Sequence, residues 1–136
     1  MAFDSVDLVA RVEGFLLKRN FKDGELVKKG QLLFQIEPEK YEAAVAAAEA
    51  DLLKARADQK NSTSDYDRQK TLLAKDAVSR RKYDEAESQK MQSDAAVLAA
   101  EAKLKQAKLD LGYTKITAPF DGRMSFNRYS EGNLVS

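Results

Sequence analysis

Residues 10–27 read ARVEGFLLKRNFKDGELV, and residues 118–135 read APFDGRMSFNRYSEGNLV. The two stretches align without gaps at an offset of 108 residues, so that Gly14 coincides with Gly122. The other matches are Ala10 with Ala118, Glu13 with Asp121, Phe21 with Tyr129, Asp23 with Glu131, Gly24 with Gly132, and Leu26-Val27 with Leu134-Val135. The chain therefore carries one β-like motif twice, once near each end.

The segment between the two copies has a different composition. It contains no glycine from Gln31 to Leu111 and is rich in Ala, Lys, Glu, Gln and Leu, the residues that favour long helices. The two copies can pair with each other only if this segment turns back on itself. The sequence therefore predicts an antiparallel helical hairpin between two halves of a β domain.

Composition excludes several classes of function. The net charge is +1, from 23 basic and 22 acidic residues, so the chain has no general attraction for nucleic acid or an anionic membrane. Cysteine and histidine are both absent, which removes disulfides, thiolate metal sites, the commonest general base and the commonest zinc ligand. The acidic pairs Asp65/Asp67 and Glu85/Glu87 are spaced by two residues and do not share a helix face. We expect no catalytic residues, no metal site and no cofactor.

The ends of the chain carry no visible targeting signal. No run approaches the about 18 consecutive apolar residues of a membrane-spanning helix. Met1-Ala2 resembles an expression start, and Val135-Ser136 ends within a strand pattern. We expect the chain to be an excised fragment of a longer protein.

Both ends show strand and turn patterns. At the first end we expect strands over residues 6–12 and 31–36, with turns at Glu13-Gly14, Asp23-Gly24 and Lys28-Lys29-Gly30. At the second end we expect strands over residues 113–118 and 123–129, with turns at Asp121-Gly122 and Glu131-Gly132. Gly24 and Gly132 are both expected to have positive φ.

The first helix is expected to begin near Pro38 and Glu39, which suit a first helical turn. Apolar and small residues then recur at alternating spacings of four and three, a coiled-coil pattern. This seam consists of Tyr41, Val45, Ala48, Leu52, Ala55, Gln59, Ser62, Tyr66, Gln69 and Leu73. It is polar at its centre, where Gln59 and Ser62 stand.

The helix pattern breaks over residues 74–78 and resumes after Ser79, which is a good N-cap. The second seam consists of Tyr83, Ala86, Lys90, Ser93, Val97, Ala100, Leu104, Ala107 and Leu111. In an antiparallel hairpin its polar positions, Lys90 and Ser93, lie opposite those of the first seam. Gly112 is expected to end the helix. Arms of about 33–36 residues give a hairpin about 50 Å long.

The second helix carries a further stripe made of Met91, Ala95, Leu98, Ala102 and Leu109. One interpretation is that the stripe widens the face buried against the first helix. The other is that it forms a lateral face that packs against a neighbouring hairpin. The residue pattern alone leaves both open.

The predicted fold is α+β, a small β-sandwich built from both chain ends with an inserted antiparallel coiled-coil hairpin. Residues 5–37 form the first half-motif, residues 38–111 the hairpin with its tip at about 74–79, and residues 112–136 the second half-motif.

This order of parts resembles the central region of periplasmic membrane fusion proteins, the adaptor subunits of tripartite efflux pumps. In that family the paired half-motifs form a lipoyl-like (biotinyl/lipoyl) β-sandwich. The pieces that carry the resemblance are Gly14-Phe15-Leu16, Phe21-Lys22-Asp23-Gly24, residues 27–33, Ile36-Glu37-Pro38, residues 111–119 and Asp121-Gly122-Arg123.

Family members of the AcrA/MexA type carry an Arg-x3-Leu-x6-Ser pattern at the hairpin tip, and this chain has it as Arg68, Leu72 and Ser79. The resemblance implies that these residues dock a TolC-like outer-membrane channel. Lys75, Asp76, Arg80 and Lys82 are possible further tip contacts, and Lys75 with residues 80–82 makes the tip basic. The plainer interpretation is that Arg68 is a solvated charge, Leu72 closes the hairpin and Ser79 only caps the second helix.

The implied function is that of a periplasmic adaptor in a Gram-negative bacterium. It links an inner-membrane transporter of the resistance–nodulation–division (RND) type, used in multidrug export, to the outer-membrane channel. Several copies form a ring with their hairpins side by side, and the longer parent is anchored to the inner membrane. The β-barrel and membrane-proximal domains of the family are absent, so the transporter is expected to bind through parts outside this chain.

Three alternatives remain. One is an adaptor of an ABC or major-facilitator type of pump, and another is a coiled-coil spacer without a channel partner. The third is a lipoyl carrier domain with a coiled-coil insertion and a modified lysine at Lys40. Lys40, however, lies at a predicted helix start and not in the tight β-turn of such carriers.

Overall fold

The computed structural model describes residues 11–19, 25–119, 121–123 and 134–135. These contain two long helices, α1 (Glu39–Ala74) and α2 (Arg80–Gly112). The strands are β1 (Gly14–Arg19), β2 (Leu26–Val27), β3 (Leu32–Ile36), β4 (Lys115–Thr117), β5 (Gly122–Arg123) and β6 (Leu134–Val135). The chain divides into a β unit, residues 1–44 and 107–136, and a helical unit, residues 45–106.

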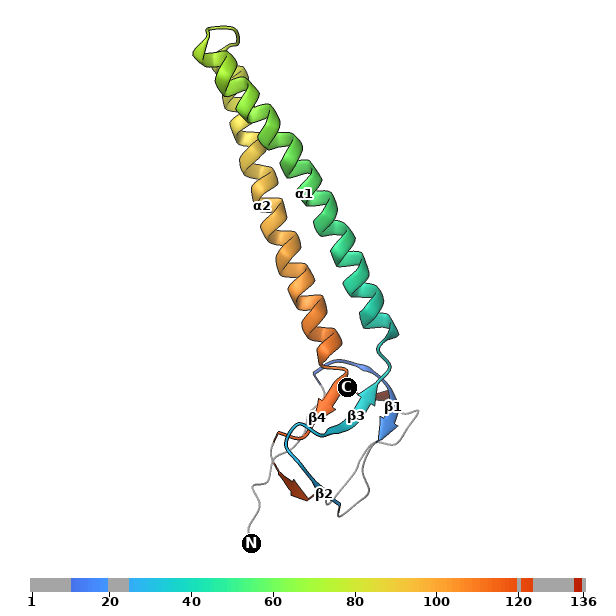
Figure 1. Cartoon of the computed structure of the whole chain (residues 1–136). Helices are drawn as coiled ribbons and strands as arrows, with labels where there is room; N and C mark the ends of the chain where they lie inside the picture. The colour runs from blue at the N-terminus through green and yellow to red at the C-terminus, as the bar shows by residue number, and fades with distance from the viewer. Residues whose placement is uncertain (1–10, 20–24, 120, 124–133, 136) are drawn as a thin grey trace. The chain divides into compact units, whose positions relative to one another are not determined.

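The β unit contains two antiparallel sheets, and each joins strands from both ends of the chain. The four-stranded sheet has the order β4-β3-β1-β6, and the two-stranded sheet pairs β2 with β5. Strands β1 to β3 precede the helices and β4 to β6 follow them, as the colours of Figure 1 show. The predicted pairing of the two chain ends is confirmed.

The two copies of the sequence repeat make equivalent strand pairings. In one sheet Gly14 lies opposite Val135, and in the other Gly122 lies opposite Val27. The offset of the sequence repeat relates the members of these two pairs. The next pairs along, Phe15 with Leu134 and Arg123 with Leu26, obey the same relation. The repeat is therefore realised as an internal twofold relation between the half-motifs.

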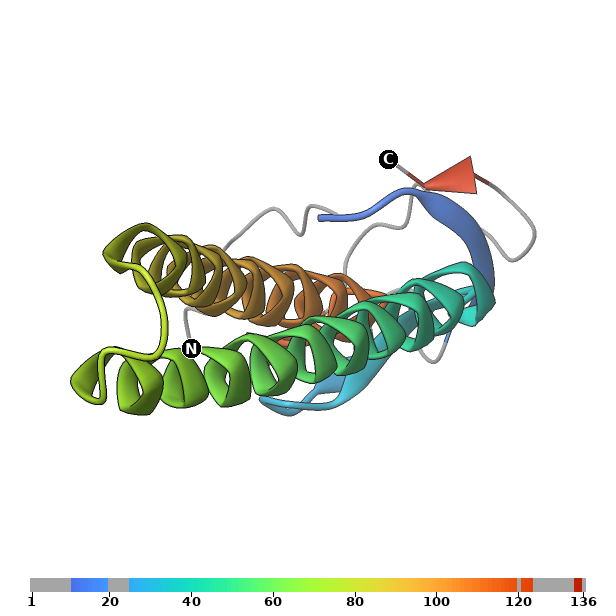
Figure 2. The same cartoon turned by 90° about the horizontal axis from the view of Figure 1, so that it is seen from above.

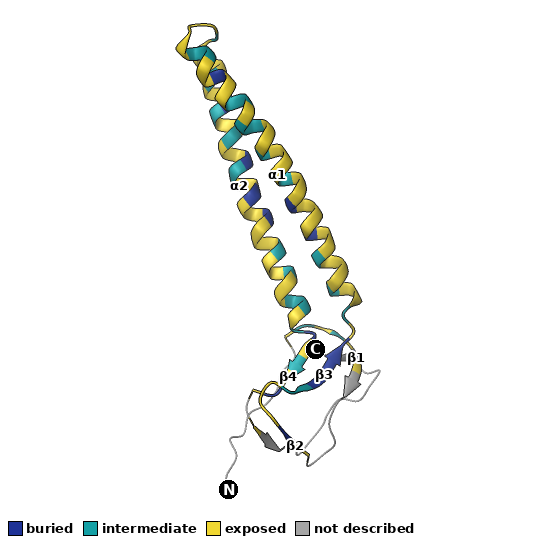
Figure 3. Cartoon of the chain, in the orientation of Figure 1, coloured by how far each residue is buried: buried dark blue, intermediate teal, exposed yellow. Residues whose placement is uncertain are grey.

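One apolar core lies between the two sheets. Val27 belongs to the two-stranded sheet and packs with residues of the four-stranded sheet. Strand β3 is buried on both of its faces, with Leu33 and Ile36 fully buried, and it is dark blue in Figure 3. The core residues are Leu16, Val27, Leu33, Phe34, Ile36 and Ala118, with Val12 and Ile116 packed against them. This arrangement confirms the predicted small sandwich.

Polar contacts close the β unit at the ends of both helices. The Thr114 hydroxyl is buried and donates to the Leu111 carbonyl at 2.6 Å. The buried Gln35 amide donates to the Thr114 carbonyl at 3.2 Å. The Tyr41 hydroxyl donates to the Glu13 carbonyl and so ties the first turns of α1 to the segment before β1. These bonds satisfy polar groups that burial would otherwise penalise.

The turns predicted at Glu13-Gly14 and Asp121-Gly122 are wrong, because both glycines begin strands. At Gly14 the reason for glycine is a close approach, since a Cβ there would lie 2.5 Å from Ile36 Cγ2. The turn predicted at residues 28–30 is confirmed. Gly30 has a φ of 84°, and the Gln31 N–H donates to the Lys28 carbonyl at 3.0 Å.

The strand predicted over residues 6–12 is wrong where it can be compared, because Arg11 and Val12 lie in a bend. The chain leaves this bend to enter β1, and the Arg11 guanidinium lies 5.0 Å from the ring centre of Tyr113. Residues 6–10, residues 124–129 and the turn glycines Gly24 and Gly132 lie outside the described residues.

The two predicted helices and both seams are confirmed. The helices contain 36 and 33 residues and run side by side in Figures 1 and 2. Every residue of the two predicted seams is buried or half-buried. A cluster of Leu52, Val97 and Ala100, with Ala55 and Leu104 against it, forms the apolar core of the helical unit. No helix among the described residues is long and apolar enough to cross a membrane.

The further stripe on α2 does not widen the buried face. Met91 is 64% exposed, Leu98 67% and Leu109 42%, and Ala95 and Ala102 are exposed as well. On α1, Leu53 is 72% exposed, and Ala46, Ala50 and Ala57 at helical spacing around it are also exposed. Each helix therefore has an apolar lateral face that is not covered within the described chain.

Gly112 is the last residue of α2, as expected, but it does not have the left-handed conformation of a glycine cap, because Gly30 is the only described glycine with positive φ. The Thr114 hydroxyl and N–H, which both donate to the Leu111 carbonyl, close this end instead. Glycine is therefore not required at this position by its backbone conformation.

We predict that Gly14→Ala lowers the free energy of unfolding by about 1–3 kcal/mol, because the new methyl group would overlap Ile36. Gly112→Ala is the matched control, since a Cβ there meets no atom within 4 Å. It should leave stability unchanged or raise it by up to about 1 kcal/mol. Thermal unfolding of both variants checks this, and equal melting temperatures would contradict the assigned close approach.

Candidate partner-binding tip of the hairpin

The loop of residues 75–79 joins the helices through a Schellman-type cap. The Ala77 N–H donates to the Leu72 carbonyl at 2.8 Å, and the Asp76 N–H donates to the Leu73 carbonyl at 3.0 Å. Asp76 has a φ of 55° and is the only described non-glycine residue in the left-handed region. This position is usually occupied by glycine, because a Cβ is disfavoured there. The loop conformation is thus held at a cost in backbone strain.

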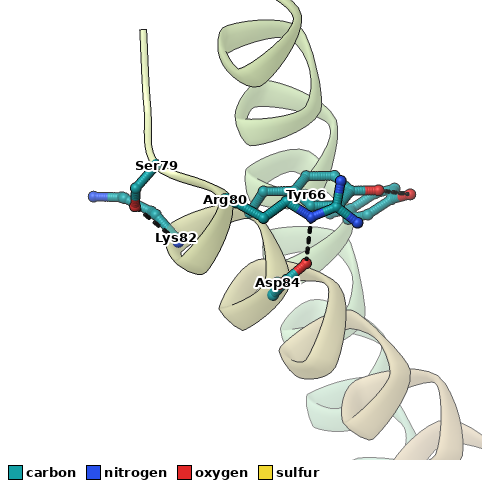
Figure 4. Close-up of polar contacts among 6 residues, drawn as sticks. Tyr66, Ser79, Arg80, Lys82 and Asp84 are labelled. Carbon is teal, nitrogen blue, oxygen red and sulfur yellow. Dashed lines mark hydrogen bonds and ion pairs between the residues drawn. The ribbon is translucent and has the colours of Figure 1, made fainter. Parts of the chain in front are cut away.

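Ser79 caps the start of α2, as predicted. Its Oγ accepts the Lys82 N–H at 3.1 Å, and its carbonyl accepts the Tyr83 N–H at 3.2 Å. Figure 4 shows the serine turned toward the Lys82 backbone. The hydroxyl is therefore committed to the cap, which satisfies one of the unpaired N–H groups of the first turn.

Arg68 lies outside the seam on the solvent-facing side of α1. Its side chain is 64% exposed and pairs with Asp65 at 3.4 Å, one turn earlier. An exposed pair of this kind contributes little to stability and can exchange partners. Leu72 is half-buried and lies four residues further on, so the two side chains share one face of the helix. The structure thus brings Arg68 and Leu72 together at the end of α1.

Two of the four basic side chains that make the tip basic pair with acidic side chains one turn later on α2. Arg80 pairs with Asp84 at 3.2 Å (Figure 4), and Arg81 pairs with Glu85 at 3.2 Å. Residues 75–85 hold four basic and three acidic side chains, a net charge of +1. Lys75, Asp76, Arg80 and Lys82, the possible tip contacts, are all exposed. The tip therefore presents exposed charges of both signs at separate positions, which a partner can contact individually.

A tyrosine pair lies below the tip and was not foreseen as a pair. The hydroxyl groups of Tyr66 and Tyr83 are 3.2 Å apart, and the ring centres are 5.6 Å apart. The hydrogen bond with Tyr66, together with burial and the nearby Glu87 carboxylate, raises the pKa of Tyr83 to about 12. Both tyrosines were assigned to the seams, and their similar distances from the tip were the available signal.

A polar bridge crosses the middle of the hairpin. The Gln59 amide donates to Asp94 Oδ1 at 2.9 Å, and the Lys90 ammonium contacts Asp94 Oδ2 at 2.9 Å. The Lys90 hydrogen bond lowers the pKa of Asp94, and the same bond raises the pKa of Lys90. The predicted level of the polar positions is confirmed, since Gln59 reaches the neighbour of Ser93. Asp94 itself was missed because it lies beside the seam.

The remaining candidate groups do not assemble into a reactive site. Asp65 contacts Arg68 and Gln69, and Glu85 contacts Arg81. Among the described residues no group of three or more acidic side chains could hold a metal ion. Lys40 is exposed in the first turn of α1, with its ammonium 5.6 Å from the Tyr41 ring centre. That helical position differs from the β-turn lysine of a lipoyl carrier.

We predict that Asp76→Gly raises the free energy of unfolding by about 1 kcal/mol, because glycine adopts positive φ without a steric penalty. Ala77→Gly is the neighbouring control and should not stabilise, since Ala77 does not have positive φ. Urea unfolding followed by helical circular dichroism measures both. A lower midpoint for Asp76→Gly would mean that the aspartate side chain stabilises this turn.

Known proteins share this arrangement. The family described as "RND MFP, barrel-sandwich hybrid domain", that is, RND membrane fusion proteins, matches residues 4–136. The chain is 42% identical over 135 residues to the antibiotic efflux pump periplasmic linker protein ArpA of Pseudomonas putida, covering 99% of this chain and 33% of the relative. It is 37% identical over 134 residues to the multidrug efflux pump subunit AcrA of Escherichia coli K12, covering 98% of this chain and 34% of the relative.

Solved structures of efflux proteins also resemble this chain. A MacA–MexA chimeric protein containing the Pseudomonas aeruginosa MexA α-hairpin domain aligns with a TM-score of 0.65 and 38% identity, over 96% of this chain and 42% of that one. A putative efflux transporter from Bacteroides eggerthii aligns with a TM-score of 0.70 and 28% identity, over 98% and 37%. The chain spans about a third of the length of the curated relatives it matches. With its hairpin, its interleaved sheets and a family match over nearly its whole length, the chain belongs to the barrel-sandwich hybrid domain family of RND membrane fusion proteins.

Proposed function

We propose that the chain is the channel-facing part of a periplasmic adaptor that links an inner-membrane RND-type efflux transporter to a TolC-like outer-membrane channel. The observation that carries the proposal is a closed helical hairpin, with its seam residues buried or half-buried, that ends in a tip motif whose Arg68 is exposed. A relative that is 42% identical in sequence is an efflux pump periplasmic linker by name. The parent protein is then periplasmic, anchored at the inner membrane of a Gram-negative bacterium, and not an enzyme.

Each part of the chain has a separate task in this proposal. Residues 38–111 form the hairpin, and residues 5–37 and 112–136 form the lipoyl-like domain that joins both of its ends. The strand pairings between the chain ends support this division, because they hold the two ends of the inserted segment in one unit. The transporter binds parts of the adaptor that lie outside this chain.

The tip docks the channel through Arg68 and Leu72 in this proposal. Arg68 offers a planar fork of N–H donors that suits carboxylates or the carbonyls of a helix end. Its present partner Asp65 is itself about half exposed, so the pair gives way at small cost. Leu72 supplies an apolar anchor beside it. Ser79 acts by fixing the start of α2, and Lys75, Asp76, Arg80 and Lys82 surround this contact.

Lateral faces support a ring of hairpins. Leu53 on α1 and Leu98 on α2 are exposed and, judged from the Arg56–Glu101 and Gln59–Asp94 contacts, lie within about one helical turn of the same height. When identical copies stand side by side in one direction, the α1 face of one therefore meets the α2 face of the next. Such a head-to-tail contact between different surfaces forms a ring when the rotation from one copy to the next closes on itself. Small alanine side chains on both faces permit close helix approach.

We predict that Arg68→Asp weakens channel binding by at least about tenfold without unfolding the hairpin, because Arg68 is exposed and outside the seam. Arg56→Asp is the control, since Arg56 is a similarly exposed α1 arginine distant from the tip. A pull-down with the chain tethered densely on beads adds weak tip contacts together. Normal binding by a folded Arg68→Asp variant would refute tip docking, whereas loss in both variants would indicate a general charge effect.

We predict that a variant with Leu53→Cys and Leu98→Cys forms intermolecular disulfides that yield closed oligomers, because the two positions meet only between copies. A variant with Leu53→Cys and Lys60→Cys, both exposed on α1, is the control and should give at most random dimers. Non-reducing electrophoresis after mild oxidation on the bead surface separates these results. Equal ladders from the two variants would contradict lateral packing.

A further inference from the structure

The helical unit has two halves whose seams differ in chemistry. The base half, residues 45–58 and 95–106, contains the buried cluster of Leu52, Val97 and Ala100. The tip half, residues 59–94, has polar side chains at most of its seam positions. These are Gln59, Ser62 and Gln69 on α1 and Lys90 and Ser93 on α2. Apolar burial therefore holds the two helices together mainly in the base half.

Hydrogen bonds do not replace that burial, because most of them stay within one helix. The Ser93 hydroxyl donates to the Lys90 carbonyl at 2.9 Å, and the Gln69 amide donates to Asp65 at 3.3 Å. The Lys90–Asp94 pair also joins residues one turn apart on α2. All three survive when the helices separate, so none of them opposes separation.

Few polar contacts cross between the helices in the tip half. Those given by the described residues are Gln59 to Asp94 at 2.9 Å and the Tyr66–Tyr83 hydroxyl pair at 3.2 Å. The Lys90 ammonium also lies 5.9 Å from the Tyr66 ring centre. The Gln59–Asp94 contact stands at the boundary with the apolar base half.

Gln69 carries a desolvation cost that disfavours contact between the two helices in the tip half. Its side chain is buried, with 5% exposure, and its Oε1 atom has no hydrogen-bond partner among the described residues. A buried acceptor without a donor bears its full desolvation penalty, and separation of the helices lets water satisfy it. Gln69, three residues after Tyr66, therefore favours the open state.

We propose that the tip half opens and closes by local separation of α1 and α2 while the base half stays closed, with the Gln59–Asp94 bridge as the boundary. The opening itself follows from the seam chemistry alone and does not depend on the proposed adaptor role. Its consequence for docking does rest on that role. Opening of this kind changes how the α1 face that carries Arg68 and Leu72 is presented to the partner.

Amide hydrogen exchange of the whole chain tests the proposal. We expect the interior helical amides of the tip half to be protected at least about tenfold less than those of the base half. The variant Gln59→Leu with Lys90→Leu fills the polar layer and should raise tip-half protection toward the base-half value. The matched control, Arg56→Leu with Glu101→Leu, likewise removes a contact between the helices and adds two leucines, but in the base half. It should leave tip-half protection unchanged.

Equal protection of the two halves in the unsubstituted chain would overturn the proposal, and so would a tip half that gains equally from both double variants. If the variant with Gln59→Leu and Lys90→Leu fails to fold, distances between spin labels test the opening in a chain that keeps its native seam residues. Labels at Asp67 and Lys82 span the tip half, and labels at Asp51 and Lys103 span the base half, all at exposed positions. A broader distance distribution for the tip pair supports the opening, and equally narrow distributions overturn it.

Discussion

Among the described residues neither end of the chain forms a sheet of its own, and the β unit depends on pairing between the two ends. Strand β1 pairs with β6, β2 with β5, and β3 with both β1 and β4. The loop closed by these pairings is the entire helical segment, so closing it is favourable only if that segment is compact and returns to its start. Two antiparallel helices of 36 and 33 residues satisfy this condition.

Periodicity could be predicted from sequence because it is a property of many residues together. Every residue that the alternating spacing assigned to a seam is buried or half-buried, and the polar centre was placed at the correct level. Single glycines were less informative. Gly14 and Gly122 looked like turn residues but begin strands, and at Gly14 the need for glycine arises from Ile36, distant in sequence. A local pattern cannot distinguish positive φ from a close tertiary approach.

In the candidate site, too, residues with partners close in sequence could be predicted and residues with distant partners could not. Ser79 could be assigned as a cap because its partner, the Lys82 N–H, is three residues away. The left-handed Asp76 could not be foreseen, since aspartate has only a weak preference for that conformation. Asp94 was missed because it bridges from beside the seam. The role of Arg68 depends on a partner outside the chain, so the structure supports it through exposure and place alone.

The equivalence of the Gly14–Val135 and Gly122–Val27 pairings has a consequence for how such a domain can vary. The sheets fix only where the helical segment leaves and where it returns. Seven residues added to each arm at the same level would preserve both seams and the sheet pairing, and would lengthen the hairpin by about 10 Å. The length of the hairpin can thus change by one heptad in both arms at a time, without any change in the β domain.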